Sequence, residues 1–328
     1  LKYWEMSRSR KNGLGFAKQF CGREDSQNRD QCFWNSAGLG FRPAGGCGRN
    51  AGRILFFGKM KKIEKRKRLC YKSIMKKIIA IGGGEIGRPG FPIETTKMDK
   101  EIIKLTSKKN PRLLFLPTAS GDSESYLQTV EKYFGKKLKC KVDVLYLSKN
   151  IFSENQIRDK ILASNIIYVG GGNTLKMIKI WKKLGVDKFL KEAYEKGVVL
   201  SGVSAGAICW FKYGNSDSLK MKDKKASSIR VSGLGFIPAL FCPHYDFEKY
   251  RKPELKKMML KNSVIAIAID NCCAIEIIDD TYRIISSKDS ANAYRVFWSK
   301  GRFNHELIPK SKELKILSNL LDKKKDIC

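Results

Sequence analysis

The stretch Val198-Val-Leu-Ser-Gly-Val-Ser-Ala-Gly-Ala-Ile-Cys-Trp210 joins a short apolar segment to a run of small residues that can begin a helix. Between the two lies Gly-x-Ser-x-Gly, with a glycine two residues before and two residues after Ser204. Glycine at both places suits a turn too sharp for side chains. The pattern predicts a strand, a tight turn and a helix, with the Ser204 hydroxyl at the strand's carboxyl end. We therefore expect an α/β fold with Ser204 as a nucleophile, although such a turn also occurs without chemistry.

A second strand pattern runs into three glycines in Asn-Ile-Ile-Tyr-Val-Gly-Gly-Gly-Asn-Thr, residues 165–174, and helical spacing follows it. Glycines let a peptide N–H approach a ligand closely, and Asn173 or Thr174 can cap the next helix. An ordinary strand-to-helix loop would look the same. Because this loop precedes the Ser204 turn, it predicts one half of an oxyanion hole, with the Ala205 N–H as the other. No phosphate-loop Lys-Ser/Thr follows, which argues against a nucleotide site.

A general base is predicted from the chain's two histidines. His244 lies in Phe-Cys-Pro-His-Tyr-Asp, residues 241–246, directly after an apolar strand-like run, whereas His305 lies in a polar turn near the C-terminus. A serine nucleophile needs a base that titrates near neutral pH. We predict His244 for this role. The structural alternative for it is a loop histidine that stacks beside Tyr245.

These three motifs together resemble a known family. Gly-Gly-Gly-Asn-Thr, then Gly-x-Ser-Ala-Gly-Ala, then Pro-His-Tyr-Asp is the motif order of the dipeptidase E group of serine peptidases, which also includes alpha-aspartyl dipeptidases and cyanophycinases. The resemblance runs from about Met75 to the C-terminus. It implies a flavodoxin-like parallel sheet of the class I glutamine amidotransferase type, a Ser–His–acid triad, and hydrolysis of small peptides through an acyl-enzyme without a cofactor. By that match Ser204 is the nucleophile and His244 the base. The oxyanion N–H groups would come from Gly171, Gly172 and Ala205.

The triad acid is where the sequence departs from the family pattern. The family typically has a Glu on a loop after the His, and the matching position here carries Asn271, with Asp270 just before it. An Asn can orient an imidazole but cannot stabilise imidazolium as a carboxylate does. Asp270 takes the role if the loop is shifted by one residue, and Glu276 faces either the site or solvent. Two hypotheses therefore stand: an active peptidase, and a catalytically weak or silent binding protein of the same fold.

Substrate choice rests on Arg251, with Asn173 and Thr174 as further substrate-binding candidates. An acidic N-terminal residue, as in Asp-X dipeptides, needs a cation near the site, and Arg251 follows His244 by seven residues at the start of a predicted helix. Its planar guanidinium suits a carboxylate. The alternative is a solvent-facing helix arginine. Class I amidotransferases have Cys at the sharp turn where this chain has Ser, so amidotransfer is not expected, and Cys209 is expected to pack in the core.

From Met75 onward the sequence alternates β and α patterns, which predicts a parallel sheet with helices on both faces. After about residue 228 the strand patterns shorten and alternate, which predicts hairpin strands with one helix at residues 252–260. Residues 82–87, Gly-Gly-Gly-Glu-Ile-Gly, fit a dinucleotide fingerprint in form. Arg88-Pro-Gly90 breaks the helix that such a site needs, so no nicotinamide cofactor is expected.

The composition argues against several other classes of protein. With 328 residues and 42% hydrophobic content, the chain can form one large α/β domain. It contains no run of 18 apolar residues and no signal peptide with a clean apolar core. Ten cysteines without a C-x-x-C pair, together with two histidines, do not suit a zinc site. We expect a cytoplasmic protein with reduced thiols and no metal or membrane partner, as a monomer or homodimer.

The first 74 residues differ from the remainder. They hold 18 Lys and Arg against 5 Asp and Glu and show no sustained periodicity. One hypothesis is a basic arm for nucleic acid or anionic lipid. The other is upstream sequence translated before Met75, where a strand begins at once. We favour the second, so we expect a catalytic domain over residues 75–328, a dispensable segment over residues 1–74, and no nucleic-acid partner.

Overall fold

The structure is a computed structural model that describes residues 74–149 and 151–324. The predictions about a separate, dispensable and basic segment concern residues that lie outside this range, apart from Ile74. From Met75 onward, the first strand begins within three residues, as the sequence predicts.

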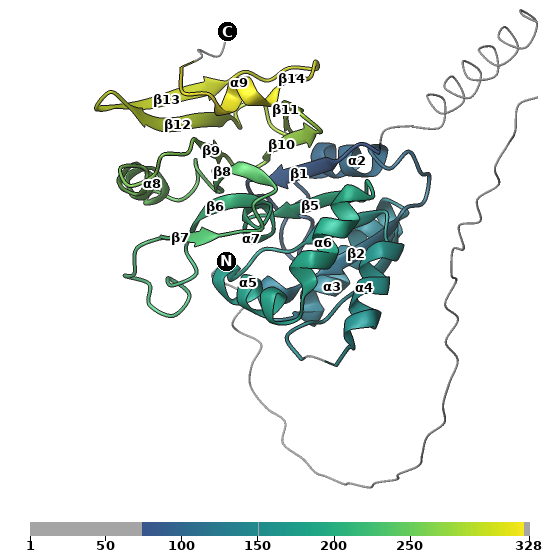
Figure 1. Ribbon diagram of the computed structural model, residues 1–328. Coiled ribbons are helices and arrows are strands. Elements are labelled where there is room, and N and C mark those ends of the chain that lie inside the picture. The colour runs from purple at the N-terminus through teal and green to yellow at the C-terminus, as the bar shows by residue number, and fades with distance from the viewer. Residues whose placement is uncertain (1–73, 150, 325–328) are drawn as a thin grey trace, which may run out of the picture. The chain divides into compact units, whose positions relative to one another are not determined.

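An eight-stranded sheet carries the predicted parallel strands, in the order β14-β11-β10-β1-β5-β4-β2-β3 (Figure 1). Its parallel strands are β1 (Lys77–Ile81), β2 (Arg112–Leu116), β3 (Lys141–Val144), β4 (Ile166–Val169) and β5 (Val199–Val203). The antiparallel strands β10 (Cys273–Ile278), β11 (Thr281–Ser286) and β14 (Lys315–Ile316) extend it beyond β1. β4 and β5 are buried along their whole length, which explains their largely apolar sequences; the one hydroxyl in β5, that of Ser201, donates to the Ile167 carbonyl at 3.0 Å. Both predicted motif loops follow these two central neighbours.

Helices cover both faces of this sheet, as predicted. Along β2 the side chains alternate: Leu114 joins a core cluster with Ile157 and Trp181, whereas Phe115 packs edge-on against Tyr126. The helices of the first face are α4 (Glu154–Ala163), α5 (Thr174–Lys183) and α6 (Val186–Glu195). On the other face lies α3 (Glu124–Val130), which continues into the π-helical segment η2 (Glu131–Lys137). α2 (Thr96–Lys104) contacts β1 and β11, and a short 3-10 turn, η1 (Thr118–Ser120), follows β2.

A second sheet of six strands has the order β13-β12-β9-β8-β6-β7. Its strands are β6 (Phe211–Ser216), β7 (Ile229–Ser232), β8 (Ile237–Cys242), β9 (Ala266–Ile269), β12 (Ala293–Ser299) and β13 (Arg302–Ile308). The predicted C-terminal hairpins are the antiparallel pairs β10–β11 and β12–β13. β8 and β9 instead pair in parallel, with α8 (Arg251–Met259) between them in the chain. The residues that follow β8 and β9 therefore meet at one edge of the sheet.

Three elements differ from the sequence interpretation. The helix that the alternating pattern predicts between β2 and β3 is α3 followed by a π-helical segment. Helix α6 was not among the predicted elements, although Val186, Phe189, Leu190 and Ala193 are buried at helical spacing. His305 lies in β13 and not in a turn, because the polar residues around it form an edge strand paired with β12. The remaining short helices are α7 (Ala205–Ile208) and α9 (Leu317–Leu321).

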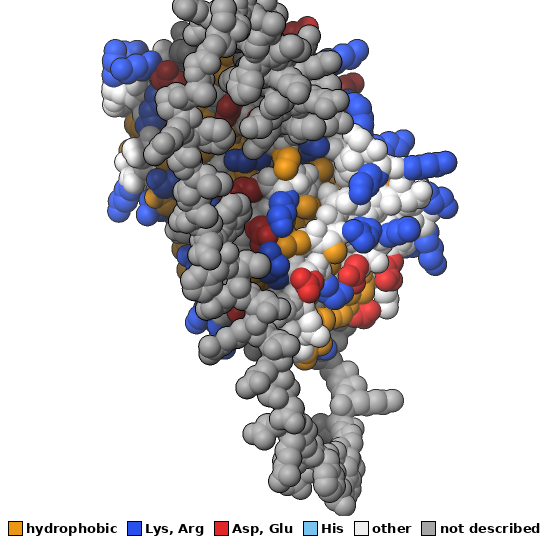
Figure 2. Space-filling model, turned by 45° about the vertical axis from the view of Figure 1, so that its right-hand side comes forward, with side chains coloured by type: hydrophobic (Ala, Val, Ile, Leu, Met, Phe, Trp, Pro, Cys, Tyr) orange, Lys and Arg blue, Asp and Glu red, His pale blue; other side chains and the backbone are white. Residues whose placement is uncertain are grey.

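The high Lys content is spread over the surface. On the face shown in Figure 2, many Lys and Arg side chains project outward, with fewer Asp and Glu among them. Within residues 74–149 and 151–324, none of the helices has the length and apolar character that crossing a bilayer requires. That same part of the chain holds no group of three His, Cys, Asp or Glu side chains placed to bind a metal ion.

Candidate active site

The turn at Ser204 has the sharpness that its glycines predict. Ser204 connects β5 to α7 with φ 57° and ψ −114°, a backbone conformation rare outside glycine. A Cβ atom on Gly202 would lie 2.4 Å from the Gly206 carbonyl oxygen, and one on Gly206 would lie 2.1 Å from the Val169 oxygen. Both positions therefore require glycine, and the bend lifts the serine side chain away from the sheet.

Two hydrogen bonds join three of the predicted residues in a line. Ser204 Oγ lies 2.8 Å from His244 Nε2, and His244 Nδ1 lies 2.7 Å from Asn271 Oδ1. Because an amide oxygen only accepts, Nδ1 carries the ring proton, which leaves Nε2 free to accept from the Ser204 hydroxyl. Burial lowers the pKa of His244, and the nearby Arg251 guanidinium lowers it further. The imidazole is therefore neutral near pH 7, as a base must be.

The structure distinguishes the three candidates for the third position. Asn271 contacts His244, and its own N–H donates to Asp246 at 2.8 Å. Asp270 points elsewhere: its Oδ2 accepts from the Asn292 N–H at 2.8 Å, and burial raises its pKa to about 6. Glu276 is buried in β10 and pairs with Arg283 at 2.8 Å. Neither carboxylate is brought to His244.

Gly83, in a glycine run for which the sequence analysis predicted no function, packs against His244 and Asn271. A Cβ atom on Gly83 would lie 1.9 Å from Asn271 Oδ1 and 2.4 Å from His244 Nδ1. The His244 N–H donates to the carbonyl of Gly82 at 3.2 Å. The dinucleotide-like pattern at residues 82–87 therefore reflects close approach of two side chains. The sequence could have indicated that this loop belongs to the site, because the loop lies at the carboxyl end of β1, the strand beside β5.

The predicted oxyanion loop lies beside the serine. A Cβ atom on Gly171 would be 3.5 Å from Ser204 Cβ, so this peptide runs past Ser204, and its N–H donates to the Tyr126 hydroxyl at 3.4 Å. Gly172 has φ +142°, and a side chain there would meet the Ala119 carbonyl at 2.2 Å. Ala205 is the first residue of α7 and directly follows Ser204. The structure thus brings Gly171 and Ala205 together around Ser204.

Asn173 and Thr174 begin helix α5. The Asn173 side chain accepts from the Lys176 N–H at 2.9 Å as the N-cap, and its Nδ2 donates to the Ser218 carbonyl at 3.2 Å. Thr174 is buried. Asn173 thereby ties the glycine loop to the segment after β6.

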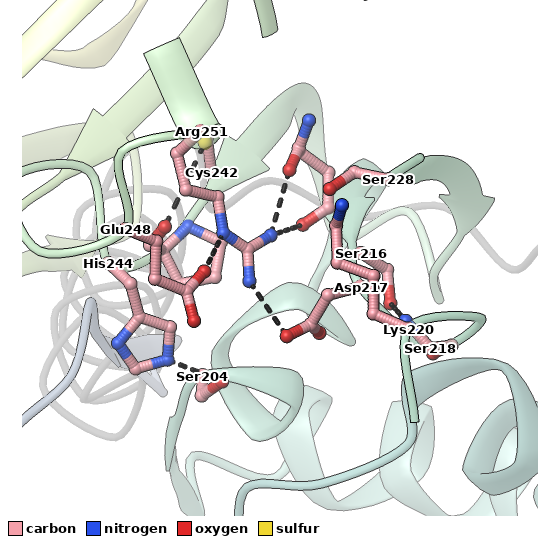
Figure 3. A network of polar contacts seen from close by, with 12 residues as sticks. Ser204, Ser216, Asp217, Ser218, Lys220, Ser228, Cys242, His244, Glu248 and Arg251 are labelled. Carbon is pink, nitrogen blue, oxygen red and sulfur yellow. Dashed lines mark hydrogen bonds and ion pairs between the residues drawn. The ribbon is translucent and has the colours of Figure 1, made fainter. Parts of the chain in front are cut away.

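Arg251 is 1% exposed, so it is not the solvent-facing arginine that was the alternative (Figure 3). Its Nε donates to Glu248, its Nη1 donates to both oxygens of Asn215 at 3.0 and 2.8 Å, and its Nη2 pairs with Asp217 at 3.2 Å. Four of the five N–H groups of this guanidinium therefore have partners within the protein.

Glu248 is a site residue that the sequence analysis did not single out. Its N–H donates to the His244 carbonyl at 3.3 Å, which closes one turn after the histidine. Burial alone would raise the pKa of its carboxyl, but Arg251 and His244 outweigh burial and lower that pKa. The sequence could have indicated Glu248, because it is a charged residue four positions after His244.

His305 and Cys209, the other histidine and the cysteine near the Ser204 turn, pack against other side chains. His305 stacks on Tyr294 and Tyr245, with ring centroids 4.5 and 5.7 Å apart. Cys209 is fully buried in the main core cluster, as expected. His244 is therefore the histidine that the fold places at Ser204.

Comparison with known proteins shows which family this chain belongs to. The family model described as peptidase family S51 matches residues 76–285. The chain is also 38% identical over 230 residues to an uncharacterized peptidase, YgaJ, of Bacillus subtilis (strain 168), an alignment that covers 69% of this chain and 94% of that relative. The chain belongs to peptidase family S51. The family predicted from the motif order is thereby confirmed, and with it membership among the serine peptidases.

Two solved peptidase structures share the fold. A crystal structure of a peptidase from an acI-B1 Actinobacterium superposes with a TM-score of 0.55 at 18% identity and covers 75% of this chain and 99% of its own. A putative peptidase E protein from Listeria monocytogenes EGD-e superposes with a TM-score of 0.50 at 22% identity and covers 65% and 98%. The predicted class I glutamine amidotransferase-like fold is confirmed.

Proposed function

We propose that this S51 member is an active serine peptidase that hydrolyses small peptides, of dipeptide size, through an acyl-enzyme on Ser204. The observation that carries the proposal is the continuous line from Ser204 Oγ through both nitrogens of His244 to Asn271 Oδ1, at 2.8 and 2.7 Å. Such a line is the arrangement that nucleophilic catalysis by serine requires.

Each group has a role in this reaction. His244 Nε2 accepts the Ser204 proton as the hydroxyl oxygen attacks the peptide carbonyl carbon. The N–H groups of Gly171, Gly172 and Ala205 bind the oxyanion of the tetrahedral intermediate. When the intermediate collapses, the C–N bond breaks and His244 gives the proton to the leaving amine. A water molecule then attacks the acyl-enzyme, with His244 again as base.

Asn271 has the role of an orienting group. Its oxygen holds the Nδ1 proton, so the imidazole keeps the tautomer and the ring direction that Ser204 needs. An amide cannot neutralise the imidazolium that forms during the reaction. The rival function, a silent binding protein of the same fold, rests on this one substitution.

Labelling with a fluorophosphonate probe separates the two functions. The full chain and its Ser204→Ala variant are incubated with the probe near pH 7.5, and labelled protein is quantified. We expect strong labelling of the natural chain and none of the variant. Equal labelling of both, or labelling of neither, would contradict the proposal. A dipeptide library assayed with the same pair then identifies the substrate.

A further inference from the structure

The proposed base lies next to a buried group of charges. Arg251, Glu248 and Asp217 form what we call the base-side ion cluster, drawn beside His244 and Ser204 in Figure 3. The side chain of Arg251 is 1% exposed, and those of Glu248 and Asp217 are 17% and 14% exposed. Charges held this far from solvent act on their neighbours more strongly than surface charges do.

A buried guanidinium at this place opposes the proposed chemistry. His244 becomes a cation in the transition state, and Arg251 is close enough to disfavour that form. Asn271 brings no charge to offset it. Unless another group compensates, the imidazolium would form beside an unopposed positive charge in a poorly solvated site.

Glu248 is placed to compensate. The hydrogen bond from its N–H to the His244 carbonyl closes a single turn, which brings residue 248 back beside residue 244. In Figure 3 its carboxylate lies between the Arg251 guanidinium and the His244 ring. Arg251 Nε and the Tyr250 hydroxyl both donate to that carboxylate, which holds it in place as an anion.

The other charged groups around His244 have different partners. Asp217 pairs with the far end of Arg251 at 3.2 Å and is the second negative charge of the cluster. Asp246 accepts from the Asn271 N–H, and Asp270 accepts from the Asn292 N–H. Gly83, which packs against the imidazole from β1, carries no charge. Arg251 therefore faces two carboxylates, of which Glu248 is the one on the His244 turn.

We infer that Glu248 supplies, from the loop before α8, the negative charge that a triad carboxylate would otherwise provide to the imidazolium of His244. In this arrangement two residues divide the work of the missing acid. Asn271 orients the ring and fixes its tautomer, while Glu248 stabilises its positive form through space. Arg251 anchors Glu248, which acts as a positioning residue and does not touch the reacting atoms. This inference rests on the proposed function, because it concerns the base of the same reaction.

The test follows the rate of fluorophosphonate labelling of Ser204 against pH, since the acidic limb of that profile reports the pKa of His244. Glu248→Gln removes the charge and keeps an oxygen for Arg251. We expect its acidic limb to move to lower pH by about one unit, and its plateau rate to fall about tenfold. Glu254→Gln is the matched control, because Glu254 lies on α8 and pairs with Lys220 at 3.0 Å. We expect its profile to match that of the natural chain.

Restoring the acid at its usual place gives the second arm. Asn271→Asp should move the acidic limb of the labelling profile to higher pH and increase the plateau rate. Both changes should be larger in the Glu248→Gln background than in the natural chain, because only that background lacks the negative charge. If Glu248→Gln does not fold, Glu248→Asp withdraws the carboxylate by one methylene and should shift the limb in the same direction.

The outcomes separate this inference from the proposed function. A natural chain without Ser204-dependent labelling would overturn the proposed function. A labelled natural chain whose limb is unmoved by Glu248→Gln, or an equal gain from Asn271→Asp in both backgrounds, would overturn the inference alone. If Glu248 serves only to bind peptide, the variant will raise KM for dipeptides and leave the probe profile unchanged, which also overturns it.

Discussion

The two halves of the candidate site are built from different parts of the chain and by different means. The half around Ser204 and Gly171 is main chain: two loops that follow the adjacent strands β4 and β5, shaped by glycines that admit no side chain. The half around His244 is made of side chains from the loops that follow β8 and β9, which pack on the backbone of Gly83 after β1. Main-chain sites are specified by steric demands that leave local motifs. Side-chain sites are specified by contacts between distant residues.

This difference predicts that the two halves fail in different ways. Damage to the main-chain half should disturb folding and activity together, since Gly206, which follows the proposed oxyanion residue Ala205, also packs against the Val169 carbonyl at the end of β4. Damage to the side-chain half should change rate or pH dependence with little effect on folding. Four predictions test this contrast.

The largest effect is expected from Gly206→Ala. Its Cβ atom would lie 2.1 Å from the Val169 carbonyl oxygen, which is backbone and cannot move aside. We expect loss of labelling and a stability loss of about 1–3 kcal/mol or more. Denaturant unfolding and probe labelling check this. Gly235→Ala, at an open position with φ +77°, is a control for backbone strain alone. Normal labelling of Gly206→Ala would contradict the claim that the main-chain half depends on glycine at this position.

The next effect separates Asn271 from Asp270. Asn271→Ala removes the side chain that hydrogen-bonds His244 Nδ1, so the labelling rate should fall by roughly 10²–10⁴-fold, the range seen when a triad base loses its orienting group. Asp270→Asn keeps an acceptor for the Asn292 N–H and should change the rate less than about threefold. The reverse order would assign the third position to Asp270.

A smaller effect concerns pH. Burial and Arg251 lower the pKa of His244, and the base works only when neutral. Activity should therefore be present above that lowered pKa and be lost as pH falls through it, with the acidic limb below about pH 6.5, the ordinary value for histidine. Labelling rates between pH 4 and 9, with circular dichroism to confirm folding, measure the limb. A limb above pH 7 would contradict the assignment of charges around the base.

The smallest effect is expected for substrate choice at Arg251. Four of its five N–H groups already have partners, so it cannot offer a two-pronged clamp to a substrate carboxylate. Arg251→Lys keeps the charge between Glu248 and Asp217. We expect the ratio of kcat/KM on Asp-Leu and Ala-Leu to change by less than about threefold. A selective tenfold loss on Asp-Leu would restore the predicted role in binding an acidic first residue.

The main-chain half of the site could be predicted from local sequence patterns. Gly202, Gly206 and the glycine loop after β4 meet steric requirements that are visible in neighbouring residues of the sequence, and they predicted an α/β fold and Ser204. The family followed when the histidine motif was added to these two. His244 followed because the chain offers only two histidines. These conclusions needed no knowledge of which distant segments meet.

The residues of the side-chain half could be assigned only from the three-dimensional arrangement of the strands. Whether Asp270 or Asn271 meets His244 depends on a one-residue register after β9, which no local pattern encodes. The burial of Arg251 depends on Asp217 and Asn215, which lie more than thirty positions away in the sequence. Electrostatic effects act across space and fall with distance between atoms, so they become visible only once β6, β8 and β9 are paired in one sheet.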